Sequence, residues 1–150
     1  MERSEARDIL RRWAKIDEEI YKTEQAYKKI WNEIDMIAAI PSPVQNITGM
    51  PHVKKVSQTT ERVALRRIEI AEAKRDKLDA LNNAIIEMMD FKKQVQDCLL
   101  LCSPDEEAVV IARYKDGLSM PEAAKKLMLS LRTAWRCEDK VLDTICDTWI

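Results

Sequence analysis

Residues 9–37 read ILRRWAKIDEEIYKTEQAYKKIWNEIDMI, and this stretch decides the fold class. Its apolar side chains recur at alternating steps of four and three residues, so they share one face of a helix. The spacing is that of a heptad seam sustained over about four repeats. The seam positions are Ile9, Trp13, Ile16, Ile20, Thr23, Tyr27, Ile30, Ile34 and Ile37. We therefore predict a long helix over residues 3–39 that buries one stripe.

A loop and a second long helix are expected to follow. Residues 41–58 hold three of the five prolines and one of the two glycines, which places the loop at 40–58. The second helix is predicted for residues 59–101, with a less regular seam near Lys74 and Arg75. Its apolar side is formed by Ala64, Ile68, Ala71, Leu78, Leu81, Ile85, Met88, Val95 and Leu99.

Composition also favours an all-α fold, because charged residues make up 34% of the chain and glycine is rare. Two long helices joined by a loop would bury their stripes against each other, as an antiparallel, coiled-coil-like hairpin over residues 1–102. Trp13, Trp31 and Met89 add more apolar surface than one neighbouring helix covers. We therefore expect the hairpin to associate with a second copy, as a homodimer.

Residues 103–150 predict a smaller domain of three helices. Ser103 can cap the first helix, with Pro104 in its first turn and Glu106 closing a capping box. Gly117 is suited to the left-handed conformation that ends a helix. Ser119 is placed to cap a short second helix that carries Ala123, Ala124 and Leu127.

A third helix is predicted from Leu131 through Leu142, after a short break around residues 128–130. Two short helices, a tight turn and a longer helix form a helix-turn-helix unit, whose last helix presents its N-terminal side chains to the major groove. For residues 143–150 the sequence leaves two possibilities open, a docked tail or a frayed end.

The stretch PDEEAVVIARYKDGLSMPEAAKKLMLSLRTAWRCEDKVL (residues 104–142) resembles the C-terminal helix-turn-helix domain of sigma-70-type factors. Within it, residues 112–127 are similar to the leading helix, glycine and Leu-Ser pattern of that family, and residues 130–142 to its recognition helix. The arrangement of a long hairpin before this domain is similar to small regulators encoded by bacteriophages and prophages. One departure is Met128, which stands where the family usually has glycine.

The resemblance implies a DNA-reading surface at the start of the third helix. Arginine can pair bidentately with guanine, and hydroxyls near a helix N-terminus suit phosphates. The candidate DNA-binding residues are Ser130, Arg132, Thr133, Arg136, Lys125 and Lys126. An alternative interpretation is that Arg132 and Arg136 are a solvated surface pair. Trp135 could pack in the core or lie against the DNA backbone, and we favour the core.

Charge limits how strongly this domain could bind DNA alone. The whole chain has a net charge of −1, and residues 104–150 hold seven basic and nine acidic side chains. No global positive field draws the protein to nucleic acid, so a dimer or RNA polymerase would have to strengthen binding. The charged N-terminus and the lack of long apolar runs favour a cytoplasmic protein.

The remaining residues give weaker signals of chemistry. Cys98, Cys102, Cys137 and Cys146 lack the close spacing of zinc knuckles, so buried thiols are expected and no metal or other cofactor is predicted. His52 is the sole histidine and has no nucleophile arranged by sequence, and Lys54 and Lys55 beside it are expected in a solvated loop. We predict no enzyme.

The sequence thus favours a DNA-binding transcription regulator of phage or prophage type, reading DNA with the helix 131–142. The alternative is a protein-interaction module that contacts RNA polymerase or another regulator through the same fold, without binding DNA directly.

Overall fold

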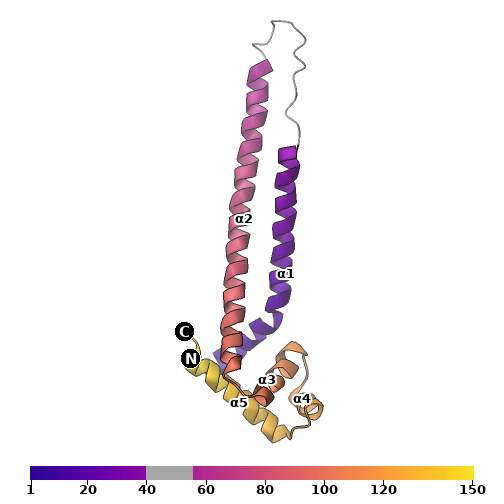
Figure 1. The fold of residues 1–150 in the computed structure, drawn as a ribbon, viewed down its shortest axis with the longest axis vertical. Coiled ribbons are helices and arrows are strands. Elements are labelled where there is room, and N and C mark those ends of the chain that lie inside the picture. The colour runs from indigo at the N-terminus through magenta and orange to yellow at the C-terminus, as the bar shows by residue number, and fades with distance from the viewer. Residues whose placement is uncertain (40–55) are drawn as a thin grey trace. The chain divides into compact units, whose positions relative to one another are not determined.

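The structure is a computed structural model that describes residues 1–39 and 56–150, with side chains for residues 1–37 and 61–150. Within these ranges every regular element is a helix, which confirms the predicted all-α class. The elements, drawn in Figure 1, are α1 (Arg3–Ala39), α2 (Val56–Leu100), α3 (Pro104–Val110), the π-helical η1 (Ile111–Lys115), α4 (Met120–Lys126) and α5 (Leu131–Thr148).

The helix boundaries differ from the predicted ones at two places. α2 begins at Val56, so residues 56–58 of the predicted loop are helical. No proline follows Pro51 there, and nothing in the local sequence interrupts the helix. α5 continues past the predicted end at Leu142 to Thr148, because its buried face extends to Ile145. The rest of the predicted loop, residues 40–55, with His52, Lys54 and Lys55, lies outside the described residues.

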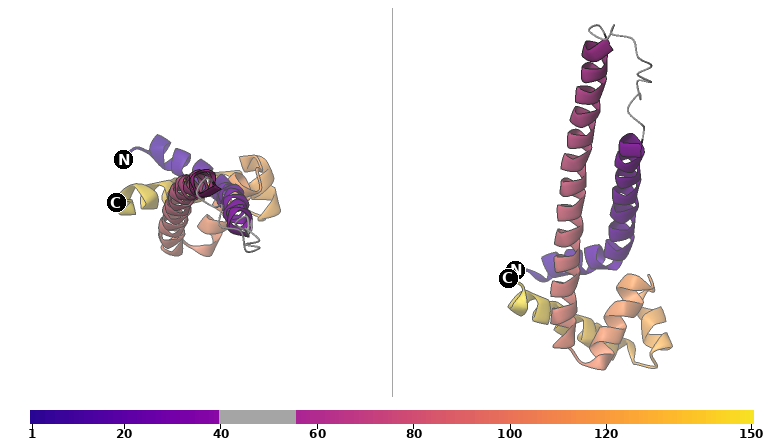
Figure 2. Two further views of the ribbon diagram at one scale, coloured as in Figure 1. Left: turned by 90° about the horizontal axis from the view of Figure 1, so that it is seen from above. Right: turned by 45° about the horizontal axis from the view of Figure 1, so that its top comes forward.

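The chain divides into two compact units. Unit 1 consists of residues 1–21 and 86–150, and unit 2 consists of residues 22–85. Each unit contains a part of α1 and an antiparallel part of α2, and in unit 1 the two chain ends lie side by side (Figures 1 and 2). This division does not test the predicted domain boundary after residue 102, which stays a prediction.

Unit 1 buries apolar side chains from α1, α2 and the C-terminal helices. The first turns of α1 contribute Ala6, Leu10, Trp13 and Ile16, all buried. α3, α4 and α5 each present an apolar face, and α5 packs against both α3 and α4. The buried side chains of these helices include Val109, Val110, Met120, Ala123, Ala134, Val141, Leu142 and Ile145. The start of α1 is therefore packed as firmly as the C-terminal helices.

In unit 2 the seams of α1 and α2 are mostly only partly buried, although Leu78 of α2 is buried. On α1, the seam from Thr23 to Ile37 is intermediate in exposure. On α2 the predicted seam position Ile68 is wrong, since 53% of Ile68 is exposed, and Ala64 is also exposed. The seam runs through Lys74 instead, which forms an ion pair with Glu33 of α1. Because a lysine occupies this seam position, the apolar pattern of α2 is interrupted there.

Serine side chains cap α3 and α4 as predicted. Ser103 and Ser119 both form complete capping boxes, with Glu106 and Glu122 respectively. Such caps satisfy backbone N–H groups that have no partner within the helix. Gly117 ends η1 with a φ of 69°, in the left-handed region that glycine adopts without strain.

Candidate nucleic-acid interface

The first turns of α5 carry four of the predicted site residues on the surface. Ser130 is the N-cap, and its Oγ accepts a hydrogen bond from the Thr133 backbone N–H at 3.1 Å and lies 2.7 Å from Thr133 Oγ1. Arg132 and Arg136 follow at helical spacing, and all four residues are exposed. The cap fixes where α5 begins and hence the directions of the two arginines.

Arg132 and Arg136 have no charged or hydrogen-bonding partner among the described residues. Neither forms an ion pair or a hydrogen bond within the described part of the chain, whereas most nearby basic residues are paired. Lys125 at the end of α4 is likewise exposed and unpaired among the described residues. Lys126 differs, because its Nζ lies 3.2 Å from a carboxylate oxygen of Asp116. Unpaired guanidinium groups keep their donors available for phosphate or base edges.

The turn before α5 holds a residue in an unusual conformation. Met128, which the sequence comparison marked as a departure from glycine, has a φ of 56° and therefore lies in the left-handed region. A side chain in the left-handed region costs about 1 kcal/mol, so the surrounding packing must hold it there. The backbone N–H of Leu129 donates to the Ala124 carbonyl at 2.9 Å, and Leu127 and Leu129 pack against the core. The turn is thus closed despite the side chain.

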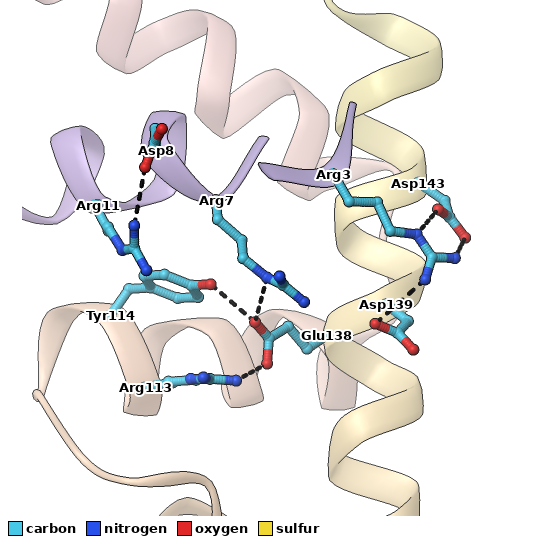
Figure 3. Close-up of polar contacts among 9 residues, drawn as sticks. All are labelled: Arg3, Arg7, Asp8, Arg11, Arg113, Tyr114, Glu138, Asp139 and Asp143. Atoms are coloured by element: carbon cyan, nitrogen blue, oxygen red, sulfur yellow. Dashed lines mark hydrogen bonds and ion pairs between the residues drawn. The ribbon is translucent and has the colours of Figure 1, made fainter. Parts of the chain in front are cut away.

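On the inner face of α5, Glu138 is fully buried and surrounded by donors (Figure 3). It forms an ion pair with Arg113 of η1, and the Tyr114 hydroxyl donates to Glu138 Oε1 at 2.8 Å. Arg7 of α1 places its Nε 3.9 Å from the same oxygen. A buried carboxylate is stable only with such partners, so the cluster joins three helical segments of unit 1.

The pKa of Tyr114 is changed by this environment. Burial first, and then its hydrogen bond to the Glu138 carboxylate, raise the pKa of Tyr114 to about 12. The phenol therefore stays protonated and remains a donor to Glu138 at neutral pH.

Trp135 does not lie in the core, so the favoured prediction for this side chain is wrong. It is 41% exposed, and the Arg113 guanidinium lies 4.8 Å from the centre of its ring. The reason is helical phase, because Ala134, Cys137, Glu138 and Val141 occupy the buried face. Trp135 instead flanks the two arginines, and together with exposed Met128 and Leu131 it adds apolar area to this surface.

Sequence reasoning missed the contribution of α1 to this region. Arg3 forms a bidentate pair with Asp143 of α5, with distances of 2.7 and 2.8 Å. Arg3 and Arg7 lie on one helical face, and Glu138 falls at a buried position of α5. A glutamate inside an apolar pattern was the available signal, because it requires a cation from elsewhere in the chain.

The other candidate chemistry is limited. Cys98 and Cys137 are buried, as predicted, whereas Cys102 and Cys146 are only partly buried, which corrects the prediction for these two. Burial raises the pKa of the Cys137 thiol above its usual range. No group of three or more potential metal ligands occurs among the described residues. In the same ranges, no helix is long and apolar enough to cross a membrane. Unit 2 has an open groove of about 280 Å³ lined by Tyr27, Lys28, Trp31 and Asn32.

Comparison with known proteins adds no relative, since no family model, curated protein or solved structure matches the chain.

Proposed function

We propose that the protein is a cytoplasmic, non-enzymatic transcription regulator of phage or prophage type that binds double-stranded DNA. In this proposal α4, the turn at residues 127–130 and α5 act as a helix-turn-helix, and α5 enters the major groove. The observation that carries the proposal is the pair Arg132 and Arg136, which are exposed near the N-terminus of α5 and unpaired among the described residues.

The roles follow from position and chemistry. Arg132 and Arg136 lie one turn apart on the outward face, opposite the buried residues of α5, and are suited to guanine edges or phosphates. Ser130 and Thr133 are at the helix N-terminus, where hydroxyls and backbone N–H groups favour phosphate. Lys125 and Lys126 on α4 would contact the DNA backbone, and Lys126 would have to exchange its partner Asp116.

The proposal also includes self-association through the α1–α2 hairpin. Unit 2 exposes several large apolar side chains, among them Trp31, Met36, Leu65 and Ile68. Burial of such surface against a second copy is favourable. A dimer would also present two reading helices, which compensates for the small number of free cations on each reading surface. A monomeric mass at micromolar concentration in analytical ultracentrifugation would exclude this part of the proposal.

The direct test is binding to a genomic DNA fragment library at two salt concentrations, followed by sequencing of the retained fragments. We expect one enriched motif whose retention falls as salt rises, because phosphate contacts release counterions. The double variant Arg132→Ala with Arg136→Ala should lose the enrichment while keeping its helicity. Retained enrichment in that variant would refute the assignment of α5 as the reading helix.

A matched control is available on α2 in unit 2. Arg62 and Arg66 have the same four-residue spacing and are exposed as well. The double variant Arg62→Ala with Arg66→Ala removes the same charge, so a general electrostatic effect would weaken binding in both double variants. Specific reading by α5 predicts loss only in the first.

A second candidate is a protein-interaction module that contacts RNA polymerase or another regulator. The exposed apolar group of Met128, Leu131 and Trp135 favours it, because Met128 is 94% exposed and such side chains are common in protein interfaces. Salt discriminates the two candidates. Binding to polymerase that persists at high salt, without enrichment of DNA at low salt, would support the second candidate.

A further inference from the structure

The outer face of α5 changes its charge along the helix. Asp139 and Asp143 follow Arg132 and Arg136 at intervals of seven residues, which is two helical turns, so all four lie on the same face. A DNA backbone that follows this face would first meet the two arginines and then two carboxylates. Carboxylates next to phosphates repel them, and this repulsion would limit binding to the first turns of the helix.

Arg3 of α1 covers these two carboxylates, as Figure 3 shows. Its Nε and Nη2 lie 2.7 and 2.8 Å from the two carboxylate oxygens of Asp143, and its Nη1 lies 3.6 Å from Asp139. The hydrogen bond to Asp143 and the charge of that group raise the pKa of Arg3 further. About half of the guanidinium side chain remains exposed, so its charge is also present at the surface.

The surrounding residues hold Arg3 in place. Ala6 and Leu10, on the next turns of α1, are fully buried in the core of unit 1. Arg7 faces inward toward the buried Glu138. The start of α1 is thus anchored on both sides, which holds the backbone of Arg3 close enough to α5 for its side chain to reach both carboxylates.

We infer that Arg3 is a charge-masking residue of the DNA interface, which neutralises Asp139 and Asp143 so that phosphates can approach α5 beyond its two arginines. The inference rests on the proposed DNA binding. It assigns a role in binding to a residue on the first turn of the chain, 140 positions from the aspartate that it pairs with.

Masking predicts a specific pattern of DNA affinities among variants of Arg3, Asp139 and Asp143. Arg3→Ala should weaken binding to the enriched DNA motif by about tenfold at low salt, and by less at high salt, because screening shortens the range of the repulsion. The double variant Asp139→Asn with Asp143→Asn removes the charges that need masking. In that background Arg3→Ala should have no further effect, so the two changes are strongly non-additive.

The experiment compares four proteins: the wild type, Arg3→Ala, the double asparagine variant and the triple variant. Affinity for the enriched motif is measured at two salt concentrations, and the thermal midpoint of each protein is measured alongside. Arg11→Ala is the matched control, because Arg11 is on the same part of α1 but pairs with Asp8 of its own helix at 2.9 Å. It should bind as the wild type does.

Each outcome decides the inference. Recovery of affinity in the triple variant, relative to Arg3→Ala, supports masking. If Arg3→Ala lowers the affinity equally in the wild-type and the double asparagine background, Arg3 either contacts DNA itself or only stabilises the fold, and both results overturn masking. A parallel fall in the thermal midpoint would identify the effect on the fold. If the wild type binds the motif and Arg3→Ala binds it equally well, masking is overturned but the proposed function is not. A wild type that enriches no DNA overturns the proposed function and masking together.

Discussion

Units 1 and 2 contain parts of the same two long helices. On α1 the apolar side chains have the same alternating spacing in both units, but they are buried more deeply in unit 1. In unit 1 the α1 positions Leu10, Trp13 and Ile16 are almost completely covered, whereas in unit 2 Ile30 and Ile34 are half-buried. The difference lies in the neighbours, because α3, α4 and α5 add a second layer only in unit 1. A heptad pattern therefore indicates which face of a helix is turned inward, but the number of packed neighbours sets how deeply it is buried.

The two units also differ in how they accommodate charge. Unit 1 holds a fully buried glutamate, Glu138, with two arginines and a tyrosine around it. Unit 2 has an ion pair at its seam, Lys74 with Glu33, whose carboxylate is partly exposed. The hydrogen bond from Lys74 holds the pKa of Glu33 below its usual range. The same type of contact should therefore matter far more in unit 1.

The largest expected effect is that of Arg113→Ala in unit 1. It leaves the buried Glu138 without its closest cation, and we expect unfolding to become easier by about 3–5 kcal/mol, because an uncompensated charge remains in the core. Chemical denaturation followed by circular dichroism measures this. Lys74→Ala is the matched change in unit 2, where Glu33 can turn to water, and it should have a much smaller effect. Similar losses in both variants would remove the distinction between the units.

Next in size is the removal of a seam side chain in each unit. Leu10→Ala leaves a cavity in a fully covered site and should destabilise the protein by about 3 kcal/mol. Ile34→Ala takes the same kind of side chain from a half-buried site, and about 1 kcal/mol is expected from the smaller area lost. The same denaturation measurement tests both. A larger loss for Ile34→Ala would mean that a second copy covers unit 2 under these conditions.

A smaller effect concerns pH and the cluster of unit 1. The pKa of Tyr114, about 12 in the folded protein, is above the value of about 10 for an unfolded tyrosine. Its contribution to stability is therefore complete below pH about 10 and is lost as pH rises through the folded value. Phenolate absorbance after a rapid pH jump should show a step centred near pH 12 that Tyr114→Phe removes. If Tyr114→Phe instead removed a step centred near pH 10, that result would contradict a buried, hydrogen-bonded phenol.

The smallest effect is expected at the strained turn of unit 1. Met128→Gly removes a left-handed side chain that is 94% exposed. The change should stabilise the protein by up to about 1 kcal/mol, because relief of strain outweighs the few lost contacts. Unit 2 has no comparable residue in its described part, where only unbroken helix occurs. A destabilised Met128→Gly protein, by thermal melting, would show that Met128 makes contacts that favour its conformation.

Most of the helices could be predicted because their signals are local. Ser103 and Ser119 cap their helices through partners three residues away. The left-handed conformation of Met128 was not predicted, because the sequence marked this residue only as a departure from the glycine of the sigma-type pattern. Ile68 and Trp135 were wrongly predicted to be buried, and the reason is different. Whether an isoleucine or a tryptophan is buried depends on the helix packed opposite, which is distant in sequence.

The candidate site was predictable only in part. Ser130, Arg132, Thr133 and Arg136 share the surface of one helix, so their grouping follows from helical spacing alone. Their proposed role in DNA binding stays a prediction. The contacts of Arg3 with Asp143 and of Arg7 with Glu138 join residues more than a hundred positions apart. Spacing within one helix contains no information about such pairs.

The sequence by itself determined the all-helical class, the long helix over residues 3–39 and the caps of the short helices, because these depend on interactions within about one helical turn. Only the tertiary structure decided which helix ends form unit 1, why Glu138 can be buried, and which cation faces Asp139 and Asp143. These depend on which surfaces exclude water together, and the free energy of burying a charge is set by partners that other parts of the chain supply.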